Sequence, residues 1–244
     1  MRARTWELLS QRLAPGWVDW IAMSPPLRGP ARGAWLGAVA CLALLAAPAA
    51  RAQDAFDADL DALRNAWAIA SYQTPEDQRR AAFEQLRTQA AALTASYPKR
   101  AEALIWNGVV LSGYAGIRGG LSALGPAREA RAALEAALAL DENALGGAAH
   151  TTLGTLYHRL PGFPISFGSD AQARAHLLRA LQISPDAIDP NYFYGAFLYD
   201  EGEYASALEH LERALRAPPR PGRELADSGR RAEIQALIAK IEQK

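Results

Sequence analysis

Residues 191–219, NYFYGAFLYDEGEYASALEHLERALRAPP, contain the clearest helical pattern of this chain. Within it, Gly195, Ala207 and Ala214 lie among larger apolar residues that recur three and four positions apart. That spacing marks one face of an α-helix. A turn signal around Gly202 divides the stretch in two. The sequence therefore predicts a pair of helices joined in a hairpin.

The same pattern occurs twice more upstream. Three sets of residues occupy equivalent positions: the glycines Gly108, Gly154 and Gly195, the leucines Leu134, Leu177 and Leu211, and the alanines Ala137, Ala180 and Ala214. The last two alanines are 34 residues apart, which is the period of a tetratricopeptide repeat (TPR). Because one hairpin cannot bury its apolar face alone, neighbouring hairpins must stack on it. We expect an all-α fold, a TPR-like helical-hairpin solenoid with a C-terminal capping helix.

Three regions follow from this pattern. Residues 53–98 predict a degenerate N-terminal helical pair, and residues 99–222 contain the TPR-like repeats. Three prolines near residue 220 interrupt the chain, and residues 223–244 then predict the capping helix, with a charged outer face suited to a solenoid terminus.

Residues 1–52 have the pattern of a secretory signal peptide. Arg28 and Arg32 precede an apolar run over residues 34–47, and Ala50-Arg51-Ala52 forms an A-x-A cleavage site. The alternative is an uncleaved anchor, but the run is shorter than the roughly 20 residues that cross a bilayer. We therefore expect a periplasmic protein without a spanning segment after cleavage. Met1 and Met23 remain alternative starts.

The cysteine content and the charge exclude several classes of function. The single cysteine, Cys41, lies inside the apolar run without the leucine of a lipobox, which disfavours a lipid anchor. After residue 52 no cysteine remains, so neither a disulfide nor a thiol nucleophile is available. The same part carries 20 basic and 24 acidic residues. Without a basic excess, nucleic acid is not expected as a partner.

The first two repeat copies carry insertions between their helices, which we expect to be long loops over residues 112–126 and 158–170. Both occupy the same place in their hairpins and therefore project from the same edge of the solenoid. Either the loops cover the core as a lid, or they form a binding surface. The candidate binding-loop residues are Tyr114, Ile117, Arg118, Leu121, Phe163, Ile165 and Phe167.

The first helix of each hairpin should line a concave groove. Its polar and aromatic residues suit a polar-ended ligand or an extended peptide, although they also suit an ordinary hydrated surface. The candidate groove residues are Thr151, Thr155, His158, Arg159, Asp189, Tyr192 and Tyr199.

Sequence signatures of catalysis are not found. The four histidines do not form H-E-x-x-H or another metal-ligand spacing, and no G-x-S-x-G is present. Trp67 and Trp106 fall on apolar helix faces, which favours a place in the core over a role as a ligand platform. We expect no enzymatic activity, no metal and no cofactor.

Several short segments carry a resemblance to a known family. They are Leu104-Ile105-Trp106-Asn107-Gly108, Gly154-Thr155-Leu156-Tyr157, Leu160-Pro161-Gly162, Gly168-Ser169-Asp170-Ala171 and Asp189-Pro190-Asn191-Tyr192-Phe193-Tyr194-Gly195. With them, residues 54–217 resemble the T-component proteins of TRAP transporters, within the TPR superfamily. The resemblance implies an all-α periplasmic protein, typically a lipoprotein, which forms oligomers and cooperates with a periplasmic solute-binding subunit.

Two functions follow as hypotheses. The first is a non-enzymatic periplasmic TPR scaffold that binds another envelope protein, such as the solute-binding subunit of a TRAP-type system. The alternative is a periplasmic protein that binds a small ligand, either an organic acid or a hydrophobic molecule, with the inserted loops closing over it.

Overall fold

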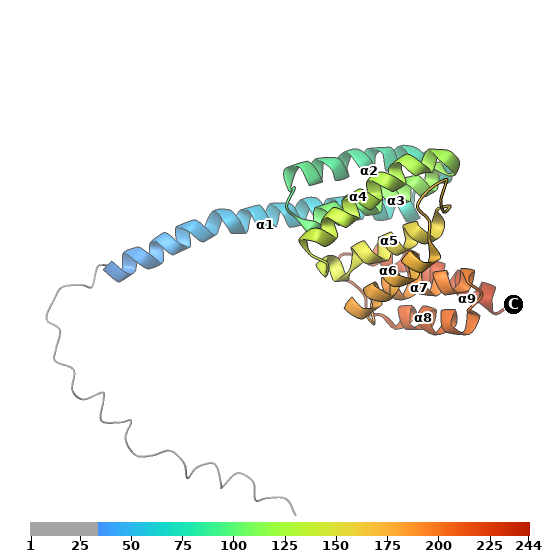
Figure 1. Cartoon of the computed structure of the whole chain (residues 1–244). Helices are drawn as coiled ribbons and strands as arrows, with labels where there is room; N and C mark the ends of the chain where they lie inside the picture. The colour runs from blue at the N-terminus through green and yellow to red at the C-terminus, as the bar shows by residue number, and fades with distance from the viewer. Residues whose placement is uncertain (1–33) are drawn as a thin grey trace, which may run out of the picture. The chain divides into compact units, whose positions relative to one another are not determined.

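The computed structural model describes the backbone of residues 34–244 and the side chains of residues 51–244. Nine α-helices and two short 3-10 helices make up this part, without a strand (Figure 1). They are α1 (Ala34–Tyr72), α2 (Glu76–Ser96), α3 (Ala101–Arg118), η1 (Gly120–Ala123), α4 (Leu124–Leu140), η2 (Ala144–Gly146), α5 (Ala148–Arg159), α6 (Asp170–Ile183), α7 (Ile188–Asp200), α8 (Tyr204–Arg216) and α9 (Glu224–Ile241). The expected all-α fold is confirmed.

The helices pair in the order that the repeats predict. Within residues 52–244, α3 packs on α4, α5 on α6 and α7 on α8, and each hairpin contacts the next (Figure 1). In each hairpin, a leucine of the second helix packs directly against a glycine of the first helix. A Cβ on Gly108 would lie 2.5 Å from Leu134 Cγ, and a Cβ on Gly154 would lie 2.6 Å from Leu177 Cγ. Glycine is therefore needed where a fully buried leucine meets the facing helix.

The third hairpin repeats this contact with slightly more room, since a Cβ on Gly195 would lie 3.0 Å from Leu211 Cγ. Leu211 of α8 also belongs to a small apolar cluster with Ile188 of α7 and Ile234 of α9. The chain thus forms a TPR-like solenoid whose last helix covers the end of the array.

The two ends of this solenoid approach each other. A Cβ on Gly229 of α9 would lie 2.4 Å from the Tyr72 ring at the end of α1. The guanidinium carbon of Arg223, just before α9, lies 5.3 Å from the centre of the Trp106 ring on α3. Because α9 returns to α1 and the segment before it reaches α3, the C-terminal end of the chain forms part of the wall on the concave side of the array.

The expectation of a long loop over residues 112–126 is wrong. Helix α3 continues to Arg118, and after η1 the helix α4 begins at Leu124. Gly113 resembles a turn signal in the sequence, but a Cβ there would lie 2.6 Å from the Phe83 ring of α2. The glycine thus serves helix packing. In the second insertion, by contrast, α5 ends at Arg159 and α6 begins at Asp170, with a loop between them.

The predicted signal peptide, residues 1–52, lies largely outside the described residues and stays a prediction. In the described part of the chain, no helix combines the length and hydropathy needed to cross a membrane.

Candidate binding cavity

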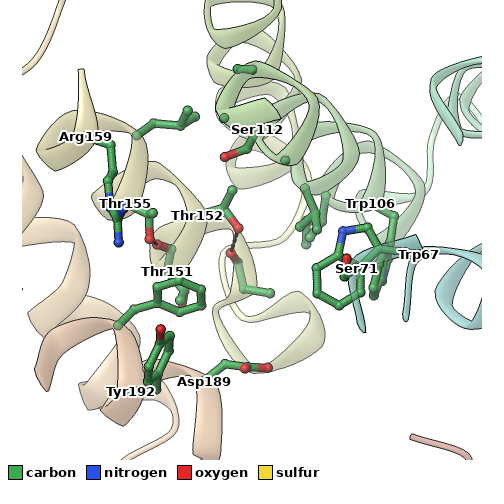
Figure 2. A pocket seen from close by; sticks show the side chains of 18 of the residues that line it. Trp67, Ser71, Trp106, Ser112, Thr151, Thr152, Thr155, Arg159, Asp189 and Tyr192 are labelled. Carbon is green, nitrogen blue, oxygen red and sulfur yellow. Dashed lines mark hydrogen bonds between the residues drawn. The ribbon is translucent and has the colours of Figure 1, made fainter. Parts of the chain in front are cut away.

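The concave side of the solenoid encloses a cavity of about 1160 Å³. Its walls come mainly from the first helix of each hairpin, α1, α3, α5 and α7, and from α9. Figure 2 shows Trp67 and Trp106 on one side, with Thr155 and Arg159 across the open space from them. A cavity of this size, lined by helices and open to solvent on one side, resembles the sites in which proteins bind small molecules.

Apolar and aromatic side chains make up much of the wall. Ile105, Val109, Leu156 and Phe193 all line it. Trp67 and Trp106 also do, with ring centres 5.9 Å apart in an edge-to-face arrangement. Both tryptophans pack against apolar neighbours of the core, as expected. Each also faces the cavity, which the sequence did not predict.

The charged residues of the wall are mostly basic. Six arginines and two carboxylates line the cavity: Arg64, Arg79, Arg159, Arg220, Arg223 and Arg230, with Asp189 and Glu233. The rest of the chain after residue 52 has an acidic excess, so this concentration of arginines is local. The cavity therefore favours anionic over cationic ligands.

Asp189 forms ion pairs with two of these arginines. Arg230 Nε donates to Asp189 Oδ1 at 2.9 Å, and Arg220 Nη1 donates to Asp189 Oδ2 at 2.6 Å. Arg220 also donates to Asp227. Burial on its own would raise the pKa of Asp189, but Arg230 and Arg220 hold it below the ordinary value. This network ties α9 and the segment before it to α7, and it keeps Asp189 ionised.

Most of the predicted groove residues do face the cavity. Thr151, Thr155, Arg159, Asp189 and Tyr192 line it (Figure 2). Thr151 and Thr155 are partly used by their own helix, because each hydroxyl donates to a carbonyl four residues earlier.

His158 and Tyr199 do not line the cavity. His158 Nε2 lies 2.9 Å from Asp200 Oδ2, and its ring packs on Phe197. The Tyr199 ring packs on Tyr204 of α8, with centres 5.6 Å apart. Both residues are near the C-terminal ends of their helices, where the neighbouring helix supplies their contacts.

The predicted loop residues separate into two groups. Ile117, Leu121 and Ile165 line the cavity. Tyr114 does not, because it is buried in α3, where its hydroxyl donates to Glu84 of α2 at 3.0 Å. Arg118 donates to the same hydroxyl and lies on that face. Their assignment to a binding loop is therefore wrong, and the reason is the extension of α3.

The last two of the predicted binding-loop residues, Phe163 and Phe167, lie in the second insertion. Phe167 packs edge-to-face on Tyr157, with Arg131 5.1 Å from its ring centre. It faces the hollow beside α4 instead of the large cavity. Phe163, in contrast, is 94% exposed.

Three exposed apolar side chains lie on the segments that join the helices of the first two repeat hairpins, and we call them the apolar rim: Leu121, Phe163 and Ile165. Leu121 is 79% exposed and Ile165 is 53% exposed, and both also line the cavity. Residues that belong to a cavity wall and are also exposed must lie where it opens to solvent. Leu121 and Ile165 therefore border a mouth of the cavity, and Phe163 lies two residues before Ile165 on the same loop.

A second polar cluster lies away from the cavity. His150 Nδ1 and His176 Nδ1 are 2.8 Å apart, and His150 Nε2 lies 3.1 Å from Glu142, which also pairs with Arg179. Burial lowers the pKa of both histidines. Sequence spacing did not indicate this contact between α5 and α6. Over the residues with described side chains, no cluster of three or more potential metal ligands is present.

Comparisons with known proteins add little. No family model matches the chain, and no curated protein does. A solved structure described as "Functional Characterization of Pseudomonas Aeruginosa pilF" is 16% identical, covers 77% of this chain and 93% of that one, and superposes with a TM-score of 0.33. This distant likeness carries no argument about function. The assignment to the class of TPR-like helical-repeat proteins rests on the hairpins described above.

Proposed function

We propose that the protein is a non-enzymatic scaffold of the bacterial envelope that binds another protein through its apolar rim. The observation that carries the proposal is the exposure of Leu121, Phe163 and Ile165 on the segments that join α3 to α4 and α5 to α6. Large apolar side chains that are exposed on neighbouring connections of a repeat array are suited to contact with a partner. Helical-repeat proteins commonly bind partners along such surfaces.

The proposed partner is the periplasmic solute-binding subunit of a TRAP-type transport system, with this chain as the T-component. The resemblance of residues 54–217 to that family supports the choice, as does the predicted signal peptide. A partner over the cavity mouth would control what enters and leaves the cavity. This gives a physical reason for the apolar rim to lie at the mouth.

The test is a binding measurement between the full chain and the solute-binding subunit of the same organism. We expect a complex by size-exclusion chromatography with light scattering. A triple variant, Leu121→Ser, Phe163→Ser and Ile165→Ser, should weaken the complex by tenfold or more, since buried apolar side chains dominate such interfaces. Leu140→Ser, which changes a half-exposed leucine elsewhere, is the matched control. Equal affinity of the triple variant and the control would refute the proposal.

The second candidate function is the binding of a small ligand inside the cavity. The observation that favours it is the 1160 Å³ volume with tryptophans and arginines in its wall. A ligand that binds the folded state alone raises the melting temperature. Unchanged melting temperatures across a panel of organic acids and lipids would argue against this function.

A further inference from the structure

Three arginines of the cavity wall, Arg79, Arg159 and Arg223, have no ion pair within residues 51–244, and Arg223 is the one that lies against Trp106. Arg223 makes neither a hydrogen bond nor an ion pair through its side chain with any residue of 51–244, and its Nε is buried. Burial lowers the pKa of Arg223, and the nearby Arg220 lowers it further. Arg220 and Arg230, in contrast, are both paired with Asp189. The guanidinium of Arg223 is therefore an uncompensated charge at the cavity wall.

A second arginine lies against the same indole ring. The guanidinium carbons of Arg64 and Arg223 lie 5.8 Å and 5.3 Å from the centre of the Trp106 ring. Arg64 uses Nη1 to donate to the exposed Asp61 at 2.9 Å, while its Nε is buried and unpaired. Two cations in contact with one ring repel each other, and an anion between them would relieve that repulsion.

The unpaired polar atoms of the molecule also gather at this cavity. Six buried side-chain nitrogen or oxygen atoms lack a hydrogen-bond partner within residues 51–244. Four of these line the cavity, namely Nε of Arg64, Arg79 and Arg223 and Nε1 of Trp67. All four are donors. Since an unsatisfied buried donor is costly, their concentration at one site indicates a ligand that supplies acceptors.

The rest of the cavity wall indicates the chemistry of the part of the ligand that lies away from the arginines. Ile105, Val109, Leu156 and Phe193 give the cavity a largely apolar interior. A small hydrophilic anion would leave this surface hydrated. An amphipathic anion would satisfy both parts, with its charged group at the arginines and its apolar body along the helices.

We propose that Arg64, Arg223, Trp67 and Trp106, the anion end of the cavity, bind the carboxylate group of an amphipathic ligand. The planar guanidinium matches a carboxylate through paired hydrogen bonds. The indole Nε1–H of Trp67 adds a neutral donor. This inference rests on the second candidate function, the binding of a ligand in the cavity, and it names the chemical class of that ligand.

The test uses two fluorescent probes that share one aromatic skeleton. Anilinonaphthalenesulfonate carries an anionic group, which stands in for the carboxylate, and N-phenylnaphthylamine lacks it. With the full chain, we expect the anionic probe to bind more tightly. Arg223→Gln should weaken its binding by about tenfold or more, because a charge-assisted hydrogen bond is lost. Binding of the neutral probe should change less than about twofold.

Two controls locate the probe. Arg80→Gln removes an exposed arginine of α2 that does not line the cavity, and it should leave both affinities unchanged. Dodecanoate should displace the anionic probe at concentrations where acetate does not. If acetate displaces the probe equally well, the site holds an adventitious ion only and the proposal fails.

The melting temperature of the ligand-free protein gives an independent readout. A buried charge without a partner destabilises the folded state, so Arg223→Gln should leave the melting temperature unchanged or raise it. A fall of several degrees would assign Arg223 a structural role and overturn the proposal.

Different results would refute the binding of a carboxylate at the anion end and the binding of any ligand in the cavity. Equal binding of both probes to the wild type, or full affinity of Arg223→Gln for the anionic probe, would refute the anion end while leaving the cavity as a ligand site. Failure of both probes to bind would refute the cavity function itself. Loss of the anionic probe in Phe163→Ser alone would place it on the apolar rim and likewise refute the anion end.

Discussion

The contact between Gly108 and Leu134 gives the sharpest test of the packing. In Gly108→Ala, the new Cβ would lie 2.5 Å from Leu134 Cγ and 2.7 Å from its Cδ2. Leu134 is fully buried, so it can yield only by moving its neighbours. Overpacking of this kind typically costs 1–3 kcal/mol, and the better helix propensity of alanine returns about 0.5–1 kcal/mol. The difference spans about 0–2.5 kcal/mol, and we expect a net loss near its middle, about 1 kcal/mol, in the free energy of unfolding.

A matched control lies eight residues further along the same helix. Gly116 of α3 has no atom within 4 Å of an added Cβ. Gly116→Ala should therefore stabilise the protein by about 0.5–1 kcal/mol. The two changes are chemically identical and have opposite expected signs.

Urea unfolding followed by circular dichroism measures both free energies. Gly154→Ala should resemble Gly108→Ala, since its Cβ would lie 2.6 Å from Leu177 Cγ, and Gly195→Ala should have a smaller effect because its closest contact is 3.0 Å. If Gly108→Ala were as stable as Gly116→Ala, the proposed role of glycine at the hairpin contacts would be refuted.

Three further predictions concern the ion pairs, the histidines and the surface. Arg230→Met leaves Asp189 with one arginine fewer and should cost about 3 kcal/mol, as measured by urea unfolding. Because burial lowers the pKa of His150 and His176, the folded state binds fewer protons than the unfolded state; stability is full above the ordinary pKa of 6.5 and falls as the pH drops below it. His176→Phe should make that decline shallower in unfolding titrations between neutral and acidic pH. Phe163→Ser should change the free energy of unfolding by less than about 0.5 kcal/mol, since the side chain is almost fully exposed; a larger loss would mean that the loop packs on the core.

The repeat positions could be predicted from the sequence because close helix packing leaves few choices of residue. Gly154 and Leu177 lie at equivalent places in each copy, and the structure brings them into direct contact. The same residue type explains why the sequence did not predict the extension of α3 to Arg118. Gly113 and Gly116 resemble turn residues, yet the first admits the Phe83 ring and the second lies within the helix.

The cavity could not be predicted from local patterns. Periodicity placed Trp67 and Trp106 on an inward face, but it does not distinguish a filled interior from a hollow one. The enclosure depends on α9 returning to α1, where Gly229 meets Tyr72. These residues are far apart in the sequence, and no short motif encodes their contact.

Photo-crosslinking in the native cells shows whether a partner protein contacts the apolar rim. A benzoylphenylalanine in place of Phe163 on the apolar rim should form a crosslink to the solute-binding subunit, identified by mass spectrometry. The same group in place of Leu140, which is half exposed away from the rim, should not. Crosslinks to that subunit from both positions alike, or from neither, would contradict the account.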